Sequence, residues 1–148
     1  MRHESRHSAF HHPNAVCRLG GPARLAAGGL CRFSAPLLLN PQPYVSGLCH
    51  CATCRKLTGS AYSATANWHQ PQFRMTGEVQ TYERRQFCSL CGSRLFYLLD
   101  GGVEVFLGTL DQAPYDIKPM LEVWTIRREP WLPPVPGIAS HAENPPKV

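Results

Sequence analysis

The sequence lacks a long apolar run: its longest notable one, Leu37-Leu38-Leu39, is far shorter than the roughly 18 residues of a membrane helix. It also lacks an apolar leader, because the first fifteen residues are rich in His and Arg, so we expect no secretory signal and no membrane association. Charged residues make up only 17% of the 148 residues, against 43% apolar residues. This balance is typical of one globular domain and argues against wholesale disorder or a two-domain enzyme.

The basic excess is confined to one segment of the chain. Residues 1–40 hold five Arg and one acidic residue, whereas residues 41–148 hold ten Lys and Arg against nine acidic residues. A nucleic-acid-binding protein more often carries a basic face on its folded body. The charge distribution therefore argues against nucleic acid as a partner.

Composition divides the chain into three zones. Residues 1–40 have no Lys and no sustained helical or strand period, so we expect a divergent, disordered N-terminal segment. Residues 41–135 form the expected domain. Residues 136–148 form an extended tail, because six Pro follow from Pro130 onward.

Short β-type runs broken by turn residues fill the middle zone. A helical turn is expected over Cys54–Gly59, and Asp100-Gly101-Gly102 predicts a hairpin turn. The predicted strand regions are 60–68, 73–76, 79–87, 94–99, 103–107 and 121–126. The pattern predicts an all-β or β-rich fold with little helix. The aromatic residues expected in its core are Tyr62, Trp68, Phe87, Phe96, Trp124 and Trp131.

Seven cysteines are the most informative feature of the sequence. They are Cys17, Cys31, Cys49, Cys51, Cys54, Cys88 and Cys91. An odd count, with three cysteines inside six residues, suits a disulfide framework poorly because such close neighbours pair only with strain. The clusters indicate metal ligands in a reducing, cytoplasmic compartment.

Zinc chemistry leaves two arrangements open. Thiolates bind zinc tetrahedrally, and three protein ligands leave a fourth position for water or substrate. Five of the cysteines could form one closed structural site with a spare thiol. Alternatively, Cys49, Cys51 and Cys54 hold one open zinc, while Cys88 and Cys91 belong to a second site.

Three ordered motifs resemble a known family. They are Cys49-His-Cys-Ala-Thr-Cys-Arg-Lys-Leu-Thr-Gly-Ser60, Phe87-Cys-Ser-Leu-Cys-Gly-Ser93 and Gly108-Thr-Leu-Asp111, followed by Trp131. The chain is similar here to the glutathione-dependent formaldehyde-activating enzyme (GFA) and centromere protein V family. That resemblance implies an Mss4-like, twisted β-sandwich-like fold around zinc sites. It also implies carbon–sulfur lyase activity on a glutathione-type thiol adduct of formaldehyde or a related small aldehyde.

The resemblance assigns roles to the cysteines. It implies a catalytic-type open zinc on Cys49, Cys51 and Cys54, and a structural zinc on Cys88 and Cys91. The family completes the second site with an earlier Cys-x-Cys, which is absent here. Only Cys31 lies near its place, so this site is expected to be incomplete. Glu122 stands where the family often has a His.

Several neighbouring residues have competing interpretations. Arg55 and Lys56 could bind the carboxylates of a thiol substrate, or be solvated charges at a helix end. His50 could be a ligand or a proton shuttle, but alternation in an extended loop points it away from the metal. Asp111 could orient a ligand or water, but a turn or strand-end cap is its expected role. The alternative to an enzyme is a non-enzymatic zinc module that binds a protein or nucleic acid. The sequence leaves the oligomeric state open.

Overall fold

The computed structural model describes residues 42–74, 79–89, 92–110 and 114–146, together with the backbone of 25–27 and 35–37. Its strands are β1 Leu25–Ala27, β2 Ala35–Leu37, β3 Val45–Cys49, β4 Ser63–His69, β5 Gln80–Tyr82, β6 Arg85–Phe87, β7 Arg94–Leu99, β8 Gly102–Phe106, β9 Leu121–Val123 and β10 Ala139–Ser140. The helical elements are α1 Ala52–Thr58 and three 3₁₀ turns, η1 Gln70–Gln72, η2 Leu107–Thr109 and η3 Thr125–Arg127.

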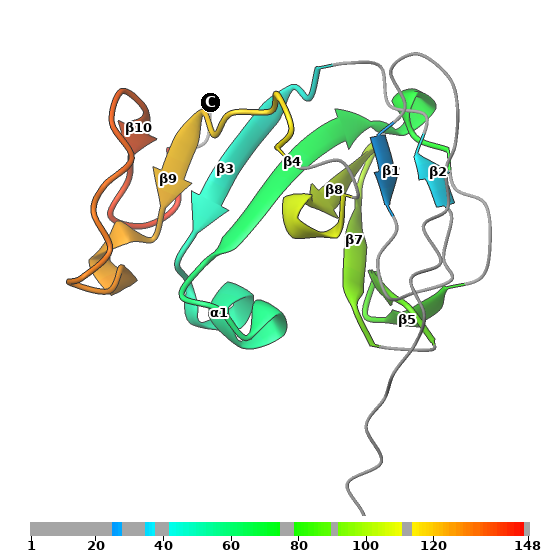
Figure 1. Cartoon of the computed structure of the whole chain (residues 1–148), viewed down its shortest axis with the longest axis horizontal. Helices are drawn as coiled ribbons and strands as arrows, with labels where there is room; N and C mark the ends of the chain where they lie inside the picture. The colour runs from blue at the N-terminus through cyan, green and yellow to red at the C-terminus, as the bar shows by residue number, and fades with distance from the viewer. Residues whose placement is uncertain are drawn as a thin grey trace, which may run out of the picture.

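Eight of these strands form one mixed sheet, in the order β10-β9-β3-β4-β8-β7-β6-β5, and β1 pairs separately with β2. Neighbours from β3 to β5 along this order are antiparallel, whereas β9 runs parallel to β3 and β10 runs parallel to β9. Helix α1 lies beyond the ends of β3 and β4 (Figure 1). The β-rich fold class with little helix is therefore confirmed for the described residues.

The two faces of the central strands differ in polarity. On β4, Ala66 and Trp68 are fully buried, and they share a face with Val103 and Val105 of β8 and with Phe96 of β7. Burial of large apolar side chains of this kind stabilises the fold by about 1.5–3 kcal/mol each. The alternate residues of β4 are polar, and they share the opposite face with Glu104 of β8. The apolar core thus lies on one face of these strands, and polar side chains lie on the other face.

Two hairpin turns differ in how clearly the sequence marks them. The expected turn after β7 is present, and Gly101 there adopts a φ of 78°. The run predicted as one strand over 79–87 is instead two strands, β5 and β6, joined through Glu83 and Arg84. Both joining residues have positive φ, at 47° and 66°. Neither is a Gly or Asn, so the usual signal of such a turn was missing from the sequence.

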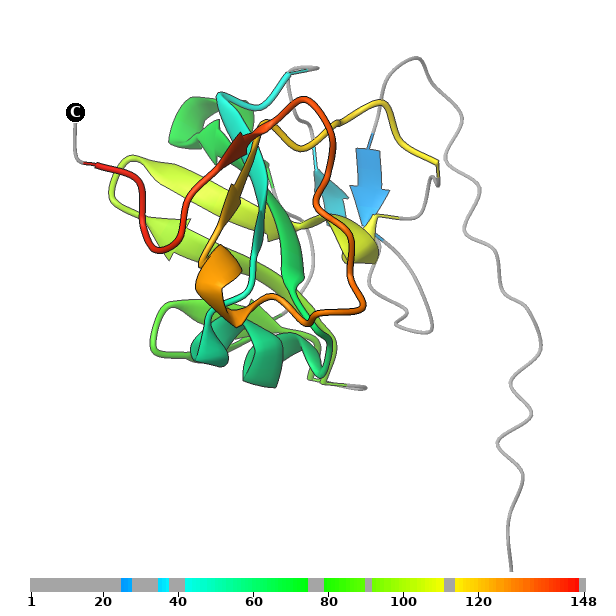
Figure 2. The ribbon, with the colours of Figure 1, turned by 90° about the vertical axis from the view of Figure 1, so that its left-hand side faces the viewer.

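The C-terminal segment returns to the sheet beside β9. Strand β10 pairs with Leu121 and Glu122, and the amide of His141 donates to the carbonyl of Glu122 at 2.8 Å. The segment lies along β9 in both ribbon views (Figures 1 and 2). The Pro-rich tail expected over 136–148 therefore includes a short paired strand.

Gly47 allows β9 to pair closely with β3. A Cβ atom at this position would lie 2.8 Å from the carbonyl oxygen of Leu121 and 2.9 Å from its Cδ1. Leu121 is the partner of Gly47 in the parallel ladder. Any larger residue at position 47 would push β9 away, together with the Glu122 that it carries.

The aromatic residues expected in the core divide into two groups. Trp68 and Phe96 are buried, while Tyr62, Phe87 and Trp124 are only half-buried. Trp131 is 71% exposed, so its placement in the core was wrong. It follows η3, where the chain has already left the sheet.

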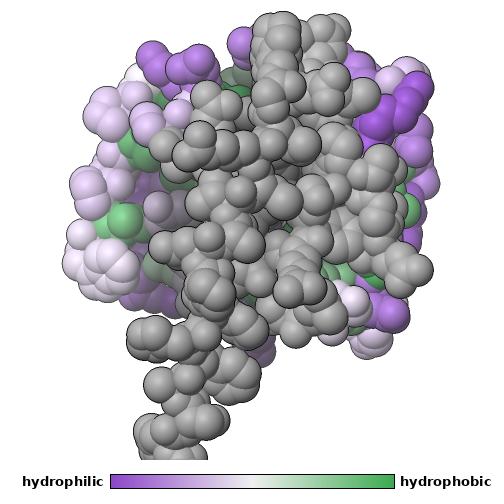
Figure 3. Space-filling model, turned by 45° about the vertical axis from the view of Figure 1, so that its right-hand side comes forward, coloured by the Kyte–Doolittle hydropathy of each residue, from purple (hydrophilic) through white to green (hydrophobic). Residues whose placement is uncertain are grey.

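The N-terminal segment contributes one described feature, the antiparallel pair β1–β2. Disorder over residues 1–40 remains an expectation, since apart from this pair the segment lies outside the described residues. None of the helices in the described part of the chain is long and apolar enough to span a bilayer. Where Figure 3 shows described residues, they are mostly hydrophilic, with small separate apolar patches.

Candidate metal centre at the end of strand β3

Three cysteines converge where β3 meets α1. Cys49 is the last residue of β3, Cys51 is the N-cap of α1, and Cys54 lies in the first turn of the helix. Their sulfur atoms all lie within 4.8 Å of one another. The sequence prediction that these three residues form one cluster is consistent with this geometry.

The local backbone explains the convergence. Cys51 has an extended conformation (φ −62°, ψ 157°), and its sulfur accepts a hydrogen bond from the Cys54 amide at 3.4 Å. The sulfur thus takes the place of the side-chain oxygen that usually caps a helix. Because α1 starts directly after Cys51, one helical turn carries Cys54 back over the end of β3.

Helix α1 ends where the sequence predicts. Gly59 adopts the left-handed conformation (φ 60°, ψ 28°), and its amide donates to the carbonyl of Arg55. Thr58 also donates its hydroxyl hydrogen to the Cys54 carbonyl at 2.9 Å. The helical turn expected over Cys54–Gly59 is therefore confirmed, and the helix begins two residues earlier, at Ala52.

Two thiols of the cysteine triplet (Cys49, Cys51 and Cys54) have pKa values shifted in opposite directions. A hydrogen bond with the Cys49 thiol lowers the pKa of Cys54 to about 5, helped by the hydroxyl of Ser63 and opposed by burial. The same hydrogen bond and burial raise the pKa of Cys49 above its ordinary value. The cluster therefore holds a negative charge at neutral pH even before a metal neutralises it.

The cluster fits a thiophilic metal ion. Sulfur atoms bound tetrahedrally to zinc at 2.3 Å lie about 3.8 Å apart, so separations within 4.8 Å need only small adjustments. One thiolate is already favoured in the cluster, and metal ligation requires thiolates. The triplet could therefore hold a metal ion with three protein ligands.

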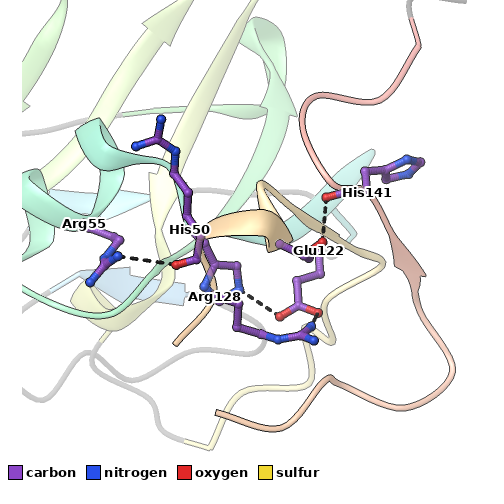
Figure 4. A network of polar contacts seen from close by, with 7 residues as sticks. His50, Arg55, Glu122, Arg128 and His141 are labelled. Atoms are coloured by element: carbon purple, nitrogen blue, oxygen red, sulfur yellow. Dashed lines mark hydrogen bonds and ion pairs between the residues drawn. The ribbon is translucent and has the colours of Figure 1, made fainter. Parts of the chain in front are cut away.

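His50 lies on the other side of the strand from the cysteine sulfurs. Its Nε2 lies 2.8 Å from Oε1 of Glu122, and Arg128 donates to Oε2 of the same carboxylate at 2.9 Å (Figure 4). His50 is fully buried and Glu122 is 1% exposed. The group of metal-ligating atoms that converge at the triplet comprises Cys49, Cys51 and Cys54 among the described residues.

The structure adds partners for Arg55 but none for Lys56. Arg55 forms an ion pair with Glu129 and donates to the carbonyl of Arg127 at 3.4 Å. Lys56 is exposed and has no hydrogen bond or ion pair among the described residues. Both line an open surface cavity of about 470 Å³, together with Ala52, Ser60 and Arg127.

The second expected metal site is only partly described. Cys88 is buried, its amide donates to the carbonyl of Ser93, and its carbonyl accepts from the amide of Gly92. Gly92 has a φ of 76°, which agrees with the backbone freedom expected of a Cys-x-x-Cys turn. Cys91, Cys31, Cys17 and Asp111 lie outside the described residues.

Sequence reasoning missed the polar residues of the sheet that face the triplet. Ser63 pairs with Cys49 in the β3–β4 ladder. Burial, together with the charge of Cys54, raises the pKa of the Glu104 carboxyl, while a hydrogen bond with Thr65 opposes the shift. The available signal was the alternation of polar and apolar residues along β4 and β8, which places Ser63, Thr65 and Glu104 on the face of Cys49.

Comparison with known families agrees with the site. Residues 31–127 match the family model described as the glutathione-dependent formaldehyde-activating enzyme. The match contains Cys49, Cys51 and Cys54, and it begins before residue 41, the domain start expected from composition. No curated protein matches the chain. Because the family match covers more than half of the residues, the chain belongs to the glutathione-dependent formaldehyde-activating enzyme (GFA) family.

Proposed function

We propose that this protein is a zinc-dependent carbon–sulfur lyase-like enzyme. It acts on a glutathione-type thiol adduct of formaldehyde or of a related small aldehyde. In the forward direction the thiolate sulfur adds to the carbonyl carbon, one carbon–sulfur bond forms, and the carbonyl oxygen takes a proton from solvent. The reverse reaction breaks that bond and releases thiol and aldehyde. The convergence of Cys49, Cys51 and Cys54 in a chain of the GFA family carries this proposal.

The triplet residues hold the metal in this proposal. Zinc bound there would supply an open coordination position and lower the pKa of a substrate thiol. Cys49 and Cys51 bring their sulfurs from the strand end and the helix cap, while Cys54 supplies the favoured thiolate. Ser63 supports that thiolate through its hydroxyl. A second, structural zinc at Cys88, Cys91 and Cys31 remains part of the proposal.

The surface cavity beside α1 supports the carboxylate-binding role proposed for Arg55 and Lys56. Arg127 adds a third cation to its lining, against the single carboxylate of Glu129 that pairs with Arg55. The net positive charge of this cavity would attract an anionic part of a thiol substrate. Lys56 and Arg127 have no ion pair with a carboxylate among the described residues, so they are the more available cations.

A cytoplasmic location also belongs to the proposal. Cys49, Cys51 and Cys54 form no disulfide within the described chain. Metal-binding thiols of this kind need a reducing compartment to remain ligands.

The test is a comparison of Cys54→Ser with Thr53→Ser, its exposed neighbour on α1. We expect Cys54→Ser to lose the zinc of the triplet and the rate of adduct formation from glutathione and formaldehyde, measured by NMR. Thr53→Ser should keep both, and both variants should keep the β-sheet signal in circular dichroism. A Cys54→Ser protein with full turnover would overturn the proposal. Intact zinc without turnover in the unmodified protein would favour the non-enzymatic module.

A further inference from the structure

A second cavity lies at the end of α1, next to the cysteine triplet. Its volume is about 510 Å³, and its described lining includes the end of α1, the start of β4, the start of β7 and η2. The polar side chains among the lining residues are Thr58, Ser60, Tyr62, Ser63, Ser93, Arg94 and Thr109. Acidic side chains are absent from the described lining.

Ser63 joins this cavity to the metal centre. It lines the cavity, it is the ladder partner of Cys49, and its hydroxyl lowers the pKa of Cys54. Thr58, one helical turn after Cys54, also lines the cavity and donates to the Cys54 carbonyl. A ligand in the cavity would therefore lie beside the triplet.

Arg94 is the unusual group in the lining. Its Nε and Nη2 atoms are buried, and among the described residues they have no hydrogen-bond partner and the guanidinium makes no ion pair. In contrast, Arg55, Arg84, Arg85 and Arg128 each pair with a carboxylate. Burial, and then the charge of Arg85, lowers the pKa of Arg94.

A guanidinium without a partner among the described residues, beside a cavity, has a preferred ligand. Buried donors left without partners destabilise the folded state, and a charged group does so more than a neutral one. Carboxylates match the planar guanidinium with two parallel hydrogen bonds. One cation surrounded by neutral hydroxyl groups balances the single charge of a carboxylate better than the double charge of a phosphate.

We propose that this cavity binds a carboxylate of the substrate through Arg94, and that Arg94 thereby restricts the enzyme to thiols that carry a carboxylate. The inference rests on the proposed function for its statement about thiols. The cavity, and Arg94 without a partner in the described part of the chain, are independent of the reaction. In this arrangement the ligand extends from the triplet, past Ser63, into the cavity.

The experiment uses the full chain with its metal bound and three probes. Glutathione carries both thiol and carboxylates, S-methylglutathione carries carboxylates without a free thiol, and cysteamine carries a thiol without a carboxylate. Dissociation constants are measured by calorimetry for the unmodified protein, for Arg94→Gln and for Arg94→Lys. Arg84→Gln is the control, because Arg84 pairs with the exposed Asp100 and does not line the cavity.

We expect Arg94→Gln to weaken binding of glutathione and S-methylglutathione about tenfold or more, corresponding to about 1.4 kcal/mol or more. Arg94→Lys should give an intermediate loss, since it keeps the charge but not the two parallel hydrogen bonds. Cysteamine binding and metal content should stay unchanged in both variants, and Arg84→Gln should match the unmodified protein.

Two results would overturn the inference. One is equal affinity of Arg94→Gln and the unmodified protein for S-methylglutathione. The other is tighter, Arg94-dependent binding of inorganic phosphate than of either carboxylate probe. If Arg94→Gln does not fold, equal affinity of Arg94→Lys and the unmodified protein for S-methylglutathione would overturn the inference instead. Arg94-dependent binding of S-methylglutathione without any thiol turnover would support the cavity and count against the proposed lyase reaction, so the two failures are distinguishable.

Discussion

At the end of β3, consecutive residues meet two different environments. Cys49 contributes its sulfur to the triplet, while the next side chain, His50, is buried against Glu122. The carboxylate of Glu122 also accepts from Arg128, and its backbone joins β9 to β10. The backbone that carries the cysteine triplet is therefore anchored by a buried polar network of His50, Glu122 and Arg128.

The substitution Glu122→Gln should show how much this network contributes to the free energy of unfolding. Removing the negative charge leaves the Arg128 guanidinium, which is 22% exposed, without its charged partner, and losing a hydrogen bond between charged groups costs about 1.5–3 kcal/mol. Urea unfolding would measure the change in the free energy of unfolding. The matched control is Asp100→Asn, which removes a carboxylate that is 97% exposed and paired with Arg84. That control should change the free energy by less than about 1 kcal/mol. Equal effects of both substitutions would contradict the prediction.

In the metal-free protein, Cys54 should show an unusual pH dependence of alkylation. Because its pKa is lowered to about 5 from an ordinary value of 9.0, it is already a thiolate at pH 6. Its rate with iodoacetamide should therefore be nearly constant from pH 6 to 8 and fall only as the pH approaches 5. An ordinary thiol would react about tenfold faster for each pH unit over the same range.

Mass spectrometry of the labelled peptides would follow each cysteine separately. Cys49, whose pKa is raised, should remain the slower site in the triplet at neutral pH. Cys54→Ser removes the sulfur that accepts the hydrogen bond of Cys49, so alkylation of Cys49 should become faster. A Cys54 rate that rises tenfold per unit between pH 6 and 8 would contradict the lowered pKa.

Sequence reasoning found the groups that are close along the chain and missed those that are distant. The triplet spans six residues, and its spacing alone indicates a metal site. The partner of His50 was not predictable, since Glu122 lies 72 residues further along the chain. In the sequence, Arg94 looks like any arginine of a β-strand. That it has no partner among the described residues depends on its surroundings in three dimensions.

At the scale of secondary structure, α1 depends on Gly59, the residue that caps its C-terminal end. Gly59 has a left-handed conformation, and no atom lies within 4 Å of the position where a Cβ would be. Gly59→Ala should therefore lower the free energy of unfolding by about 1 kcal/mol through backbone strain alone. Gly108→Ala is the control, because it also has open space but lacks a positive φ. Urea unfolding of both variants should separate strain from packing, and equal losses would show that the conformation of Gly59 is not responsible.

Strand prediction succeeded where turn chemistry was explicit. The bounds of β7 were anticipated, and Asp100-Gly101 marked the turn that follows it. Strand β3 was missed because Val45-Ser-Gly-Leu-Cys49 contains only one β-branched residue and a central Gly. That Gly is needed for the close approach of β9, a requirement that comes from tertiary pairing.

For the whole molecule, two truncations should test the second metal site. Removal of residues 1–30 keeps Cys31, and removal of residues 1–40 deletes it. If Cys31 is a ligand beside Cys88 and Cys91, zinc content measured by atomic absorption should fall only in the shorter chain. The triplet zinc should remain in both, since Cys49, Cys51 and Cys54 lie in the retained sheet and helix. Equal zinc content in both truncated chains would exclude Cys31 as a required ligand.

The parallel pairing of β3 with β9 also bears on the order in which the chain folds. Hairpins such as β7–β8 pair residues that are close in sequence, whereas β9 pairs with β3 across more than 70 residues. Pairings between such distant segments form slowly. The three thiols, in contrast, are local to one loop and helix start. We therefore expect a metal ion to be captured by a half-folded chain before β9 docks. In that sequence of events, metal supply influences the folding rate as well as the finished site.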